Sequence, residues 1–367
     1  MKAEESVYAV ALSLTKGITG SIVKNFIVRG ITPEDFFSGD IGLIPGFGAL
    51  TEDNRAAALS RARVEVDFMV RHHITPLYLG EDSYPRLLAE SGNPPVILYM
   101  LGNTDLNPEY SLSIVGTRKS TPGGNAFCSR LTEEIARHFP KALIVSGLAY
   151  GIDAAAHSGA LAAGLPTAAV LGHGLDMIYP AAHRGLASTI IQRGGALLTE
   201  YPSGTRPHRN HFLERNRIVA TISQGVLLGE SPEKGGAMST ASIAFSYTRE
   251  VMAVPGRPTD AMSRGCNSLI KSNKASMVES FDDVCRILKW TVPSETSVVK
   301  TGSLFPELSG ETKMVYDYMV TKSDPESVDS ISYGTSIPVV RLLTLLTDME
   351  FDGLVERHPG NRVLAIG

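Results

Sequence analysis

The chain has 367 residues, 43% of them hydrophobic, and 34 basic residues stand against 38 acidic ones, a formal net charge of −4. This length allows two or three domains with a large apolar core. The slightly acidic balance gives no overall attraction to a polyanion. No apolar run approaches the roughly 20 residues of a membrane-spanning helix, and the first residues lack the pattern of a signal peptide. We therefore expect a cytoplasmic protein that does not bind membranes.

The first 75 residues predict a helical domain. Apolar residues recur at helical spacing in Tyr8–Leu12, Ile22–Val28 and Ala56–Val70. Leu43–Gly48 reads LIPGFG, a tight turn like that of a helix-hairpin-helix motif, whose N–H groups can contact a DNA phosphate. A plain helix connector is the slightly favoured alternative, because no basic residue follows before Arg55. We expect residues 1–75 to form a SAM-like or helix-hairpin-helix-like domain.

Residues 76–290 alternate short apolar runs with helical segments. The nearly continuous apolar runs are typical of parallel strands covered on both faces, so an α/β fold with an extended Rossmann-like, mostly parallel sheet is predicted. Ligands of such sheets bind at the carboxyl ends of the strands. The predicted strands are Leu112–Val115, Ala142–Val145, Thr167–Leu171, Ala196–Leu198, Gly225–Leu228 and Val251–Val254. The predicted helices are Asn125–His138, Asp153–Ala163, Arg184–Gln192, Glu214–Ile222 and Ser239–Tyr247.

Residues 291–308 are rich in Ser, Thr, Val and Pro and predict a linker. Residues 309–367 follow the order helix, helix, helix and hairpin, which predicts a winged-helix domain. The third of these helices, Ile337–Phe351, has one arginine against two acidic residues and an almost wholly apolar face. A helix that reads the major groove needs polar side chains that reach the bases. We expect this domain to bind protein or to serve a structural role.

The stretch SGLAYGIDAAAH begins at Ser146, directly after a predicted strand. Gly147 and Gly151 allow a tight turn, so N–H groups at the following helix start are expected to face outward and hold a phosphate. Asp153 and His157 are four residues apart and share a helix face. Asp153 either shapes the pocket or caps its helix. For His157 a hydrogen bond inside the protein is favoured over a role in the pocket.

Basic residues concentrate between Ala181 and Arg217. Six arginines stand there against Glu200 and Glu214, a local balance of +4 in an acidic chain: 184, 193, 206, 209, 215 and 217. Together with Arg118 and Lys119 they suit a run of phosphates along a strand better than a mononucleotide. Phe212, at a predicted loop-to-helix transition, either stacks on an unpaired base or packs in the core. For Arg215 and Arg217 a salt bridge is slightly favoured over DNA contact.

Seven motifs in this order resemble the DNA processing protein A (DprA, or Smf) family: SIVGTRKST, SGLAYGIDAAAH, AVLGHGLDMIYP, LLTEYPSG, FLERNRIVA, AVPG and RGCNSLI. The resemblance is dense over about residues 76–285 and extends to the flanking domains in layout only. It implies a homodimer that binds and protects incoming single-stranded DNA and loads the RecA recombinase in natural transformation. It also implies contacts by Arg118, by Arg209 and by the stacking ring of Phe212, with no catalysis and no cofactor.

The predicted DNA-binding residues are Gly116, Thr117, Arg118, Lys119, Ser146, Gly147, Arg206, Arg209, Phe212 and Arg215. The chain also departs from the family pattern in two places. Lys234–Met238 replaces the usual Ser-Gly-Ser type of turn after the fifth predicted strand, and Lys271–Ala275 replaces the glycine-alanine pair that usually follows the Leu-Ile pair.

A different class of function is an enzyme related to lysine-decarboxylase-like phosphoribohydrolases. Those enzymes use a carboxylate and a Gly-Gly…Thr loop, for which Glu230 and Gly235–Thr240 are candidates. For Glu230, hydrogen bonding to the adjacent loop is the favoured alternative. A dinucleotide-dependent oxidoreductase is disfavoured because the sequence after Gly172 lacks the third glycine of the G-x-G-x-x-G fingerprint. The sequence shows no Walker A lysine and no zinc-ligand spacing, so no cofactor or metal is expected.

Overall fold

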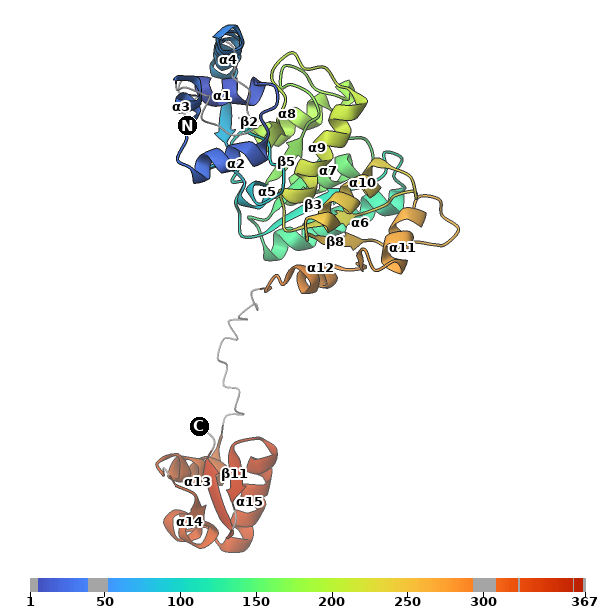
Figure 1. Ribbon diagram of the computed structural model, residues 1–367. Coiled ribbons are helices and arrows are strands. Elements are labelled where there is room, and N and C mark those ends of the chain that lie inside the picture. The colour runs from blue at the N-terminus through green and yellow to red at the C-terminus, as the bar shows by residue number, and fades with distance from the viewer. Residues whose placement is uncertain (1–5, 39–51, 293–307, 323, 359, 366–367) are drawn as a thin grey trace. The chain divides into compact units, whose positions relative to one another are not determined.

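The structure is a computed structural model that describes residues 6–38, 52–292, 308–322, 324–358 and 360–365 (Figure 1). The chain divides into two compact units, residues 1–292 and 293–367. The predicted turn at Leu43–Gly48 and most of the predicted linker lie outside the described residues.

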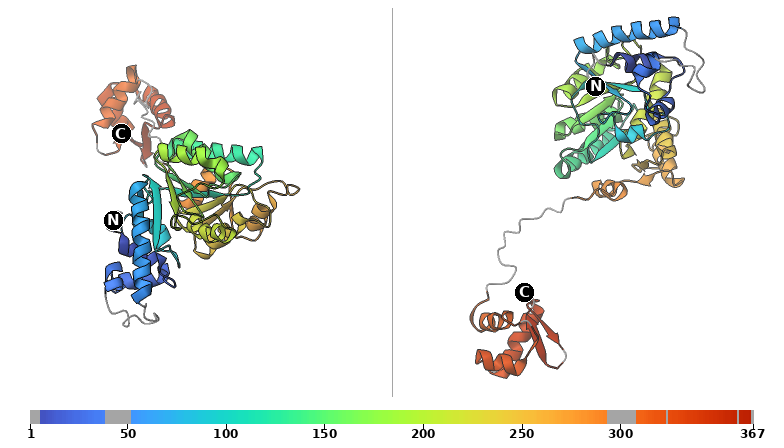
Figure 2. Two further views of the ribbon diagram at one scale, coloured as in Figure 1. Left: turned by 90° about the horizontal axis from the view of Figure 1, so that it is seen from above. Right: turned by 60° about the vertical axis from the view of Figure 1, so that its left-hand side comes forward.

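In its described residues, the larger unit begins with four helices: α1 (Val7–Leu14), α2 (Gly20–Val28), α3 (Pro33–Ser38) and α4 (Glu52–Arg71). Buried side chains of these helices, such as Leu12 and Met69, share one hydrophobic cluster with sheet residues such as Leu198. Strand β1 (Ile74–Tyr78) follows α4 directly, and Figure 2 shows the long α4 in blue beside this edge of the sheet. The predicted domain boundary between residues 75 and 76 therefore falls inside a strand.

One sheet of nine strands runs through this unit in the order β1-β2-β6-β5-β4-β3-β7-β8-β9. All neighbouring pairs from β6 to β9 are parallel, whereas β1 and β2 pair antiparallel at one edge. The predicted mostly parallel sheet is confirmed. The other strands are β2 (Ile97–Gly102), β3 (Ser111–Val115), β4 (Leu143–Ser146), β5 (Thr167–Val170), β6 (Ala196–Thr199), β7 (Gly225–Leu228), β8 (Glu250–Ala253) and β9 (Ser276–Met277).

Helices cover both faces of the sheet, as predicted. Side chains of successive strand residues point to opposite faces: Leu143 and Val145 join the cluster that contains α9, whereas Ile144 joins the cluster that contains α6. On one face lie α6 (Pro122–His138), α7 (Ile152–Ala163), α8 (Arg184–Gln192) and α12 (Phe281–Leu288). On the other lie α9 (Arg209–Thr221), α10 (Gly236–Ser246) and α11 (Arg264–Lys271).

Three helices, α6, α9 and α10, begin three to five residues earlier than predicted, and two of them start at a side-chain cap in the preceding loop. Thr121 caps α6 by accepting a hydrogen bond from the Gly124 N–H at 3.1 Å, and Pro122 occupies the first helical position. His208 caps α9 by accepting from the Asn210 N–H at 3.3 Å. Residues at the start of α9 consequently belong to a rigid helix and not to a loop.

The smaller unit has the predicted winged-helix order. Its three-stranded sheet runs β10-β12-β11. On α15 the face that packs inward is apolar, with Leu342, Leu346 and Met349 buried, and Arg341 on the outer face pairs with Glu311 at 2.9 Å. The elements are α13 (Gly310–Val320), β10 (Glu326–Ser327), α14 (Val328–Thr335), α15 (Val339–Phe351), β11 (Val355–His358) and β12 (Arg362–Ala365). Across both units, none of the described helices has the length and apolarity to span a bilayer.

Candidate functional site

A groove of about 920 Å³ opens at the carboxyl ends of β3, β4 and β7. Its walls come from the loops after β3, β4, β5, β6 and β7, from the start of α7 and from the facing sides of α9 and α10. This is the edge of the sheet at which the sequence predicted a ligand site, and it brings together segments more than 100 residues apart, such as Arg118 and Lys234.

Three side chains form a cluster on the groove wall. The guanidinium carbon of Arg118 lies 5.8 Å from the centroid of the Phe212 ring. The Tyr179 ring lies 5.5 Å from the Phe212 ring at an interplanar angle of 35°. Phe212 is half-buried and touches the backbone at Gly172, whereas Tyr179 is 45% exposed. The cluster therefore offers a cation and an aromatic surface side by side.

Tyr179 was not among the predicted site residues. Tyr179 lies in the loop after β5, directly before Pro180, and it lines the groove. In sequence it is distant from Phe212, the ring that it contacts. The available signal was an aromatic residue placed after a parallel strand, on the ligand side of the sheet. Such a residue is indistinguishable by sequence from one that packs in the core.

The groove collects seven of the ten predicted site residues: Gly116, Thr117, Arg118, Gly147, Arg209, Phe212 and Arg215. Lys119 and Arg206 are exposed but are not part of its lining. Ser146 is fully buried, and its hydroxyl donates to the Ile114 carbonyl at 2.6 Å, so its side chain faces the neighbouring strand.

The basic segment between Ala181 and Arg217 is less exposed than its sequence suggests. Arg215 is only 5% exposed and donates from Nη1 to the Val170 carbonyl at 2.6 Å. Arg217 forms a partly buried ion pair with Glu200. Arg193 follows α8 just before β6 and thus lies at the amino end of the parallel strands, away from the groove. Only part of the local charge of +4 is consequently available at the ligand edge.

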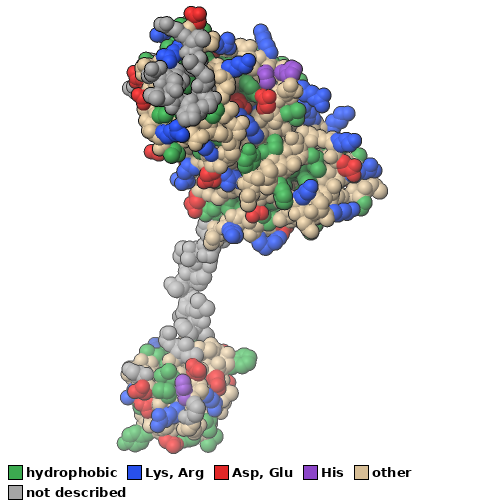
Figure 3. All heavy atoms as spheres, viewed as in Figure 1, with side chains coloured by type: hydrophobic (Ala, Val, Ile, Leu, Met, Phe, Trp, Pro, Cys, Tyr) green, Lys and Arg blue, Asp and Glu red, His purple; other side chains and the backbone are tan. Residues whose placement is uncertain are grey.

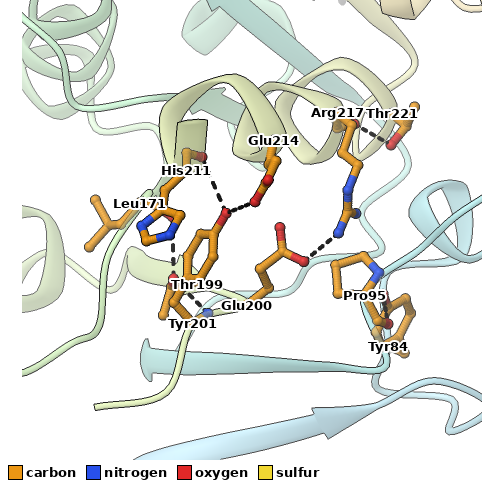
Figure 4. A network of polar contacts seen from close by, with 10 residues as sticks. All are labelled: Tyr84, Pro95, Leu171, Thr199, Glu200, Tyr201, His211, Glu214, Arg217 and Thr221. Carbon is orange, nitrogen blue, oxygen red and sulfur yellow. Dashed lines mark hydrogen bonds and ion pairs between the residues drawn. The ribbon is translucent and has the colours of Figure 1, made fainter. Parts of the chain in front are cut away.

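Polar contacts fix α9 to the loop after β6 (Figure 4). The Tyr201 hydroxyl, in the loop after β6, donates to Glu214 Oε2 at 2.8 Å, and Glu200 in the same loop pairs with Arg217. Burial raises the pKa of the Glu200 carboxyl, and the nearby Arg217 guanidinium opposes this shift. These contacts bind one side of α9 and leave the side with Arg209 and Phe212 to the groove.

Arg215 and Asp153 form the buried charged centre beneath the groove. A Cβ at Gly147 would overlap the Arg215 guanidinium and the Asp153 carboxylate, so this position requires glycine. Asp153 is 6% exposed, and it accepts a hydrogen bond from the Ala149 N–H at 3.4 Å. Burial raises the pKa of Asp153, while the positive charge of Arg215 and backbone hydrogen bonds oppose the shift. Asp153 thus both shapes the pocket and binds the loop at its helix start.

The prediction that N–H groups of the SGLAYGID stretch face outward is wrong for Gly147, Ala149 and Ile152, whose N–H groups meet acceptors inside the protein. Gly151 has φ +76° and packs against the backbone of Thr117, whose carbonyl accepts a hydrogen bond from the Ile152 N–H at 3.2 Å. The N–H groups of Gly147 and Ala149 are directed to Asp153. The reason is that the acidic residue in the first turn of α7 occupies the place in which an anion would sit.

The helix start that does open on the groove belongs to α10. Gly235 and Gly236 line the groove together with Ser239 and Thr240. Among the described contacts, no acceptor is recorded for the N–H groups of Gly236 and Ala237. The first N–H groups of an 11-residue helix, with their partial positive charge, thus face the same space as Arg118 and Lys234.

His157 has the predicted internal hydrogen bond. The Thr167 hydroxyl donates to the Ile144 carbonyl at 2.7 Å, so His157 Nδ1, 2.7 Å from the same hydroxyl, acts as the donor. His157 is fully buried, and burial together with the positive charge of Arg215 lowers its pKa to about 3. The imidazole is therefore neutral in the folded protein.

We expect the His157→Gln variant to have a weaker pH dependence of stability. The folded-state pKa of about 3 lies below the unfolded value of about 6.5, so the neutral ring's contribution is complete above pH 6.5 and is lost as the pH falls toward 3. Between these limits the wild-type free energy of unfolding should fall by up to about 1.4 kcal/mol per pH unit from this group. Urea unfolding at several pH values measures it. The exposed His73→Asn variant is the control, and equal slopes for both variants would disprove the assignment.

Glu230 has the structural role that was favoured for it. Its carboxylate accepts hydrogen bonds from the Thr121 N–H at 2.8 Å and from the Thr121 hydroxyl at 2.5 Å. The two contacts hold the start of α6 to the end of β7, and Glu230 does not line the groove. The carboxylate that an enzyme of the phosphoribohydrolase type would need is thus engaged in positioning a loop.

The larger unit is a doubly wound α/β sheet with a groove of cations and aromatic rings at its carboxyl edge, and the smaller unit is a winged helix. These features define the class: an α/β ligand-binding protein with a winged-helix domain. Residues 75–289 match the family of DNA recombination-mediator protein A, and residues 305–361 match the DprA winged helix domain. The chain belongs to the DprA family.

Several relatives show how far the similarity extends. Protein Smf of Synechocystis is 31% identical over 401 residues, which cover 99% of both chains. DNA processing protein DprA of Streptococcus pneumoniae is 38% identical over 204 residues, 56% of this chain and 71% of the relative. The X-ray structure of DprA from Streptococcus pneumoniae superposes with a TM-score of 0.63 at 30% identity, over 76% of this chain and 97% of that one.

A second solved structure concerns DNA processing protein A from Helicobacter pylori, described for its single-stranded DNA binding mode. It superposes with a TM-score of 0.52 at 29% identity, over 59% of this chain and 95% of that one.

Proposed function

We propose that this protein binds single-stranded DNA in the groove at the carboxyl edge of its sheet and delivers it to the RecA recombinase in natural transformation and DNA recombination. The observation that carries the proposal is the groove itself, in which exposed cations lie beside an exposed aromatic ring. Membership in the DprA family and the likeness to the Helicobacter pylori relative, whose description names single-stranded DNA, support it.

In this proposal the phosphates contact Arg118, Arg209 and Lys234, which are exposed and line the groove from three different segments. The N–H groups at the start of α10 add a site for one further phosphate. Gly116, Thr117 and Gly147 bring the backbone close to the strand, and the buried Arg215 holds the groove floor. Because phosphate contacts dominate, binding should be tolerant of sequence and should weaken as salt rises.

The proposed role is non-catalytic. A bond-breaking site needs a nucleophile or general base within reach of its substrate. Glu230 is the candidate for the carboxylate of the phosphoribohydrolase motif, and it is hydrogen-bonded to Thr121. The proposal therefore assigns the groove to holding a strand and not to cleaving a nucleotide.

We further propose that the protein acts as a homodimer, with the larger units of two copies placing their grooves along one DNA strand. This part rests on membership in the DprA family. Sedimentation of the full chain with and without oligonucleotide tests it: a mass of two chains is expected, and a monomer in both conditions would contradict it.

The test of the proposed function is fluorescence anisotropy of labelled oligo-dT, with duplex DNA and AMP as competitors, at two salt concentrations. We expect tight, salt-sensitive binding to the single strand, with little competition by duplex or AMP. Weak oligonucleotide binding together with effective competition by AMP would refute the proposal and favour a nucleotide-processing enzyme.

Tyr179→Ala is expected to weaken single-strand binding by about 5- to 100-fold, because base–aromatic stacking contributes about 1–3 kcal/mol per base. Tyr179→Phe should retain most of the affinity, since the ring remains. Tyr150 is the matched control: it is 47% exposed, close to the 45% of Tyr179, but does not line the groove. An equal loss in Tyr179→Ala and Tyr150→Ala, measured by anisotropy, would exclude stacking at this ring.

A further inference from the structure

A second basic surface lies beside the groove, on α11. Residues 255–275 contain four basic residues and one acidic residue, a local balance of +3. The basic residues Arg257, Arg264, Lys271 and Lys274 are all exposed. Among the described residues none of the four forms an ion pair. The segment between Ala181 and Arg217 is therefore not the only stretch of the chain with a local excess of basic residues.

The cations of α11 lie along one face of the helix. Arg264, Ser268 and Lys271 are spaced three and four residues apart, which places them on one side. The opposite side, with Cys266 and Leu269, is buried in the core of the larger unit. The exposed side borders a shallow depression of about 450 Å³, in which Glu233 is the one acidic lining residue.

This depression and the groove share one wall. The Gly265 N–H donates to the Ser231 carbonyl at 2.8 Å, which fastens the start of α11 to the loop after β7. Ser231 and Lys234 of that loop line the groove, while Glu233 lines the depression on α11. A Cβ at Gly265 would overlap the Pro232 carbonyl, so the contact between loop and helix is close. A strand that leaves the groove over this loop meets Arg264 next.

The loop after β8 is also held in place. Asn267 binds the Gly256 backbone from both sides: its side-chain oxygen accepts from the Gly256 N–H at 3.1 Å, and its side-chain nitrogen donates to the Gly256 carbonyl at 2.9 Å. The backbone that carries Arg257 is therefore held in place beside α11. Figure 3 shows blue Lys and Arg side chains gathered along the edge of the larger unit where the loops after β7 and β8 and α11 lie.

From these observations we infer that the exposed face of α11 continues the path of a single-stranded nucleic acid beyond the groove, with Arg264 and Lys271 as phosphate contacts. The inference rests on the proposed function, which it extends from one groove to a longer track. Arg264 and Lys271 are seven positions apart on the helix, which adds about 10 Å to the path of the strand. Short strands fill the groove alone, whereas longer strands reach α11.

The test compares two lengths of labelled oligo-dT, about 6 and about 25 nucleotides, since single-strand sites span about 4–16 nucleotides. The variant is the double substitution Arg264→Gln and Lys271→Gln. The matched control, Lys141→Gln with Arg193→Gln, removes the same charge from exposed cations that precede β4 and β6, at the amino ends of the strands. Anisotropy over a salt series and sedimentation of each variant complete the experiment.

We expect the variant to bind the longer strand about 3- to 10-fold more weakly, with a salt slope reduced by about 1.4, or about 0.7 for each lost phosphate contact. The short strand and the control variant should be unaffected. Equal affinity of the wild-type protein for both lengths would overturn the inference. An equal loss of the variant's affinity at both lengths would also overturn it, because that result would place the effect inside the groove.

Two further outcomes distinguish a failure of this inference from a failure of the proposed function. Failure of the wild-type protein to bind either length would refute the proposed function, and the α11 path with it. A change in subunit number in the variant alone would identify the α11 face as a contact between copies of the chain and would overturn its assignment to DNA.

Discussion

Replacing Arg215 by methionine is expected to reduce the free energy of unfolding by about 3–5 kcal/mol, because it leaves the buried Asp153 carboxylate without its counter-charge. Asp153 is 6% exposed and Arg215 is 5% exposed, so water cannot substitute for the lost partner. The measurement is urea unfolding at neutral pH followed by circular dichroism. The exposed Arg209→Met variant is the matched control and should unfold with nearly wild-type midpoint.

The pH dependence identifies the cause of this loss. Burial already raises the pKa of Asp153 above its ordinary value, and removal of Arg215 should raise it further. A carboxyl with a raised folded-state pKa favours the folded protein below its unfolded value of about 3.9 and loses that contribution as the pH rises through the folded pKa. The defect of Arg215→Met should therefore shrink in acid relative to wild type. Adding Asp153→Asn should restore part of the stability at neutral pH. A defect that is independent of pH and of Asp153 would point to lost packing instead.

Arg118→Ala is expected to weaken binding of oligo-dT by about 10- to 100-fold. A hydrogen bond to a charged group contributes about 1.5–3 kcal/mol, and its loss should also lower the salt slope by about 0.7. The position of Arg118 over the half-buried Phe212 ring, at 5.8 Å, restricts the guanidinium to the groove, so that a strand meets a positioned cation. Anisotropy at two salt concentrations measures both quantities.

Lys119→Ala is the control for this substitution. Lys119 is the next residue along the chain, is also exposed and carries the same charge, but it does not line the groove. Its loss should change affinity little beyond a general electrostatic effect. If Lys119→Ala and Arg118→Ala weaken binding equally, the positive charge of the surface and not the geometry of the groove determines affinity.

The alternation of short apolar runs with helical segments was sufficient to predict the central sheet. Six predicted runs correspond to β3–β8, because strands covered on both faces need nearly continuous apolar sequence. Three strands were missed: β1 and β9, which lie at the two edges of the sheet, and β2, which lies between β1 and β6. Pro76 interrupts the pattern of β1, which proteins tolerate at a sheet edge, and the antiparallel pair has no crossover helix to mark it.

The candidate site was predicted in its location and less well in its details. Glycine and polar residues after each strand indicated the ligand edge, and Arg118, Arg209 and Phe212 do lie together there. The charge count could not separate Arg209, which is exposed, from Arg215, which is buried, since both are arginines near the start of one helix. Exposure depends on which face of α9 packs on the sheet.

The sequence by itself therefore determined the parallel α/β class, the winged helix and the family, because these depend on periodicity and on motifs that are local in the chain. Only the tertiary structure decided that Asp153 turns the N–H groups after β4 inward, that α10 opens on the groove, and that Tyr179 joins Phe212 on its wall. The physical reason is that hydrogen bonds and ring contacts between distant segments depend on the distances that folding sets, and spacing along the chain does not encode them.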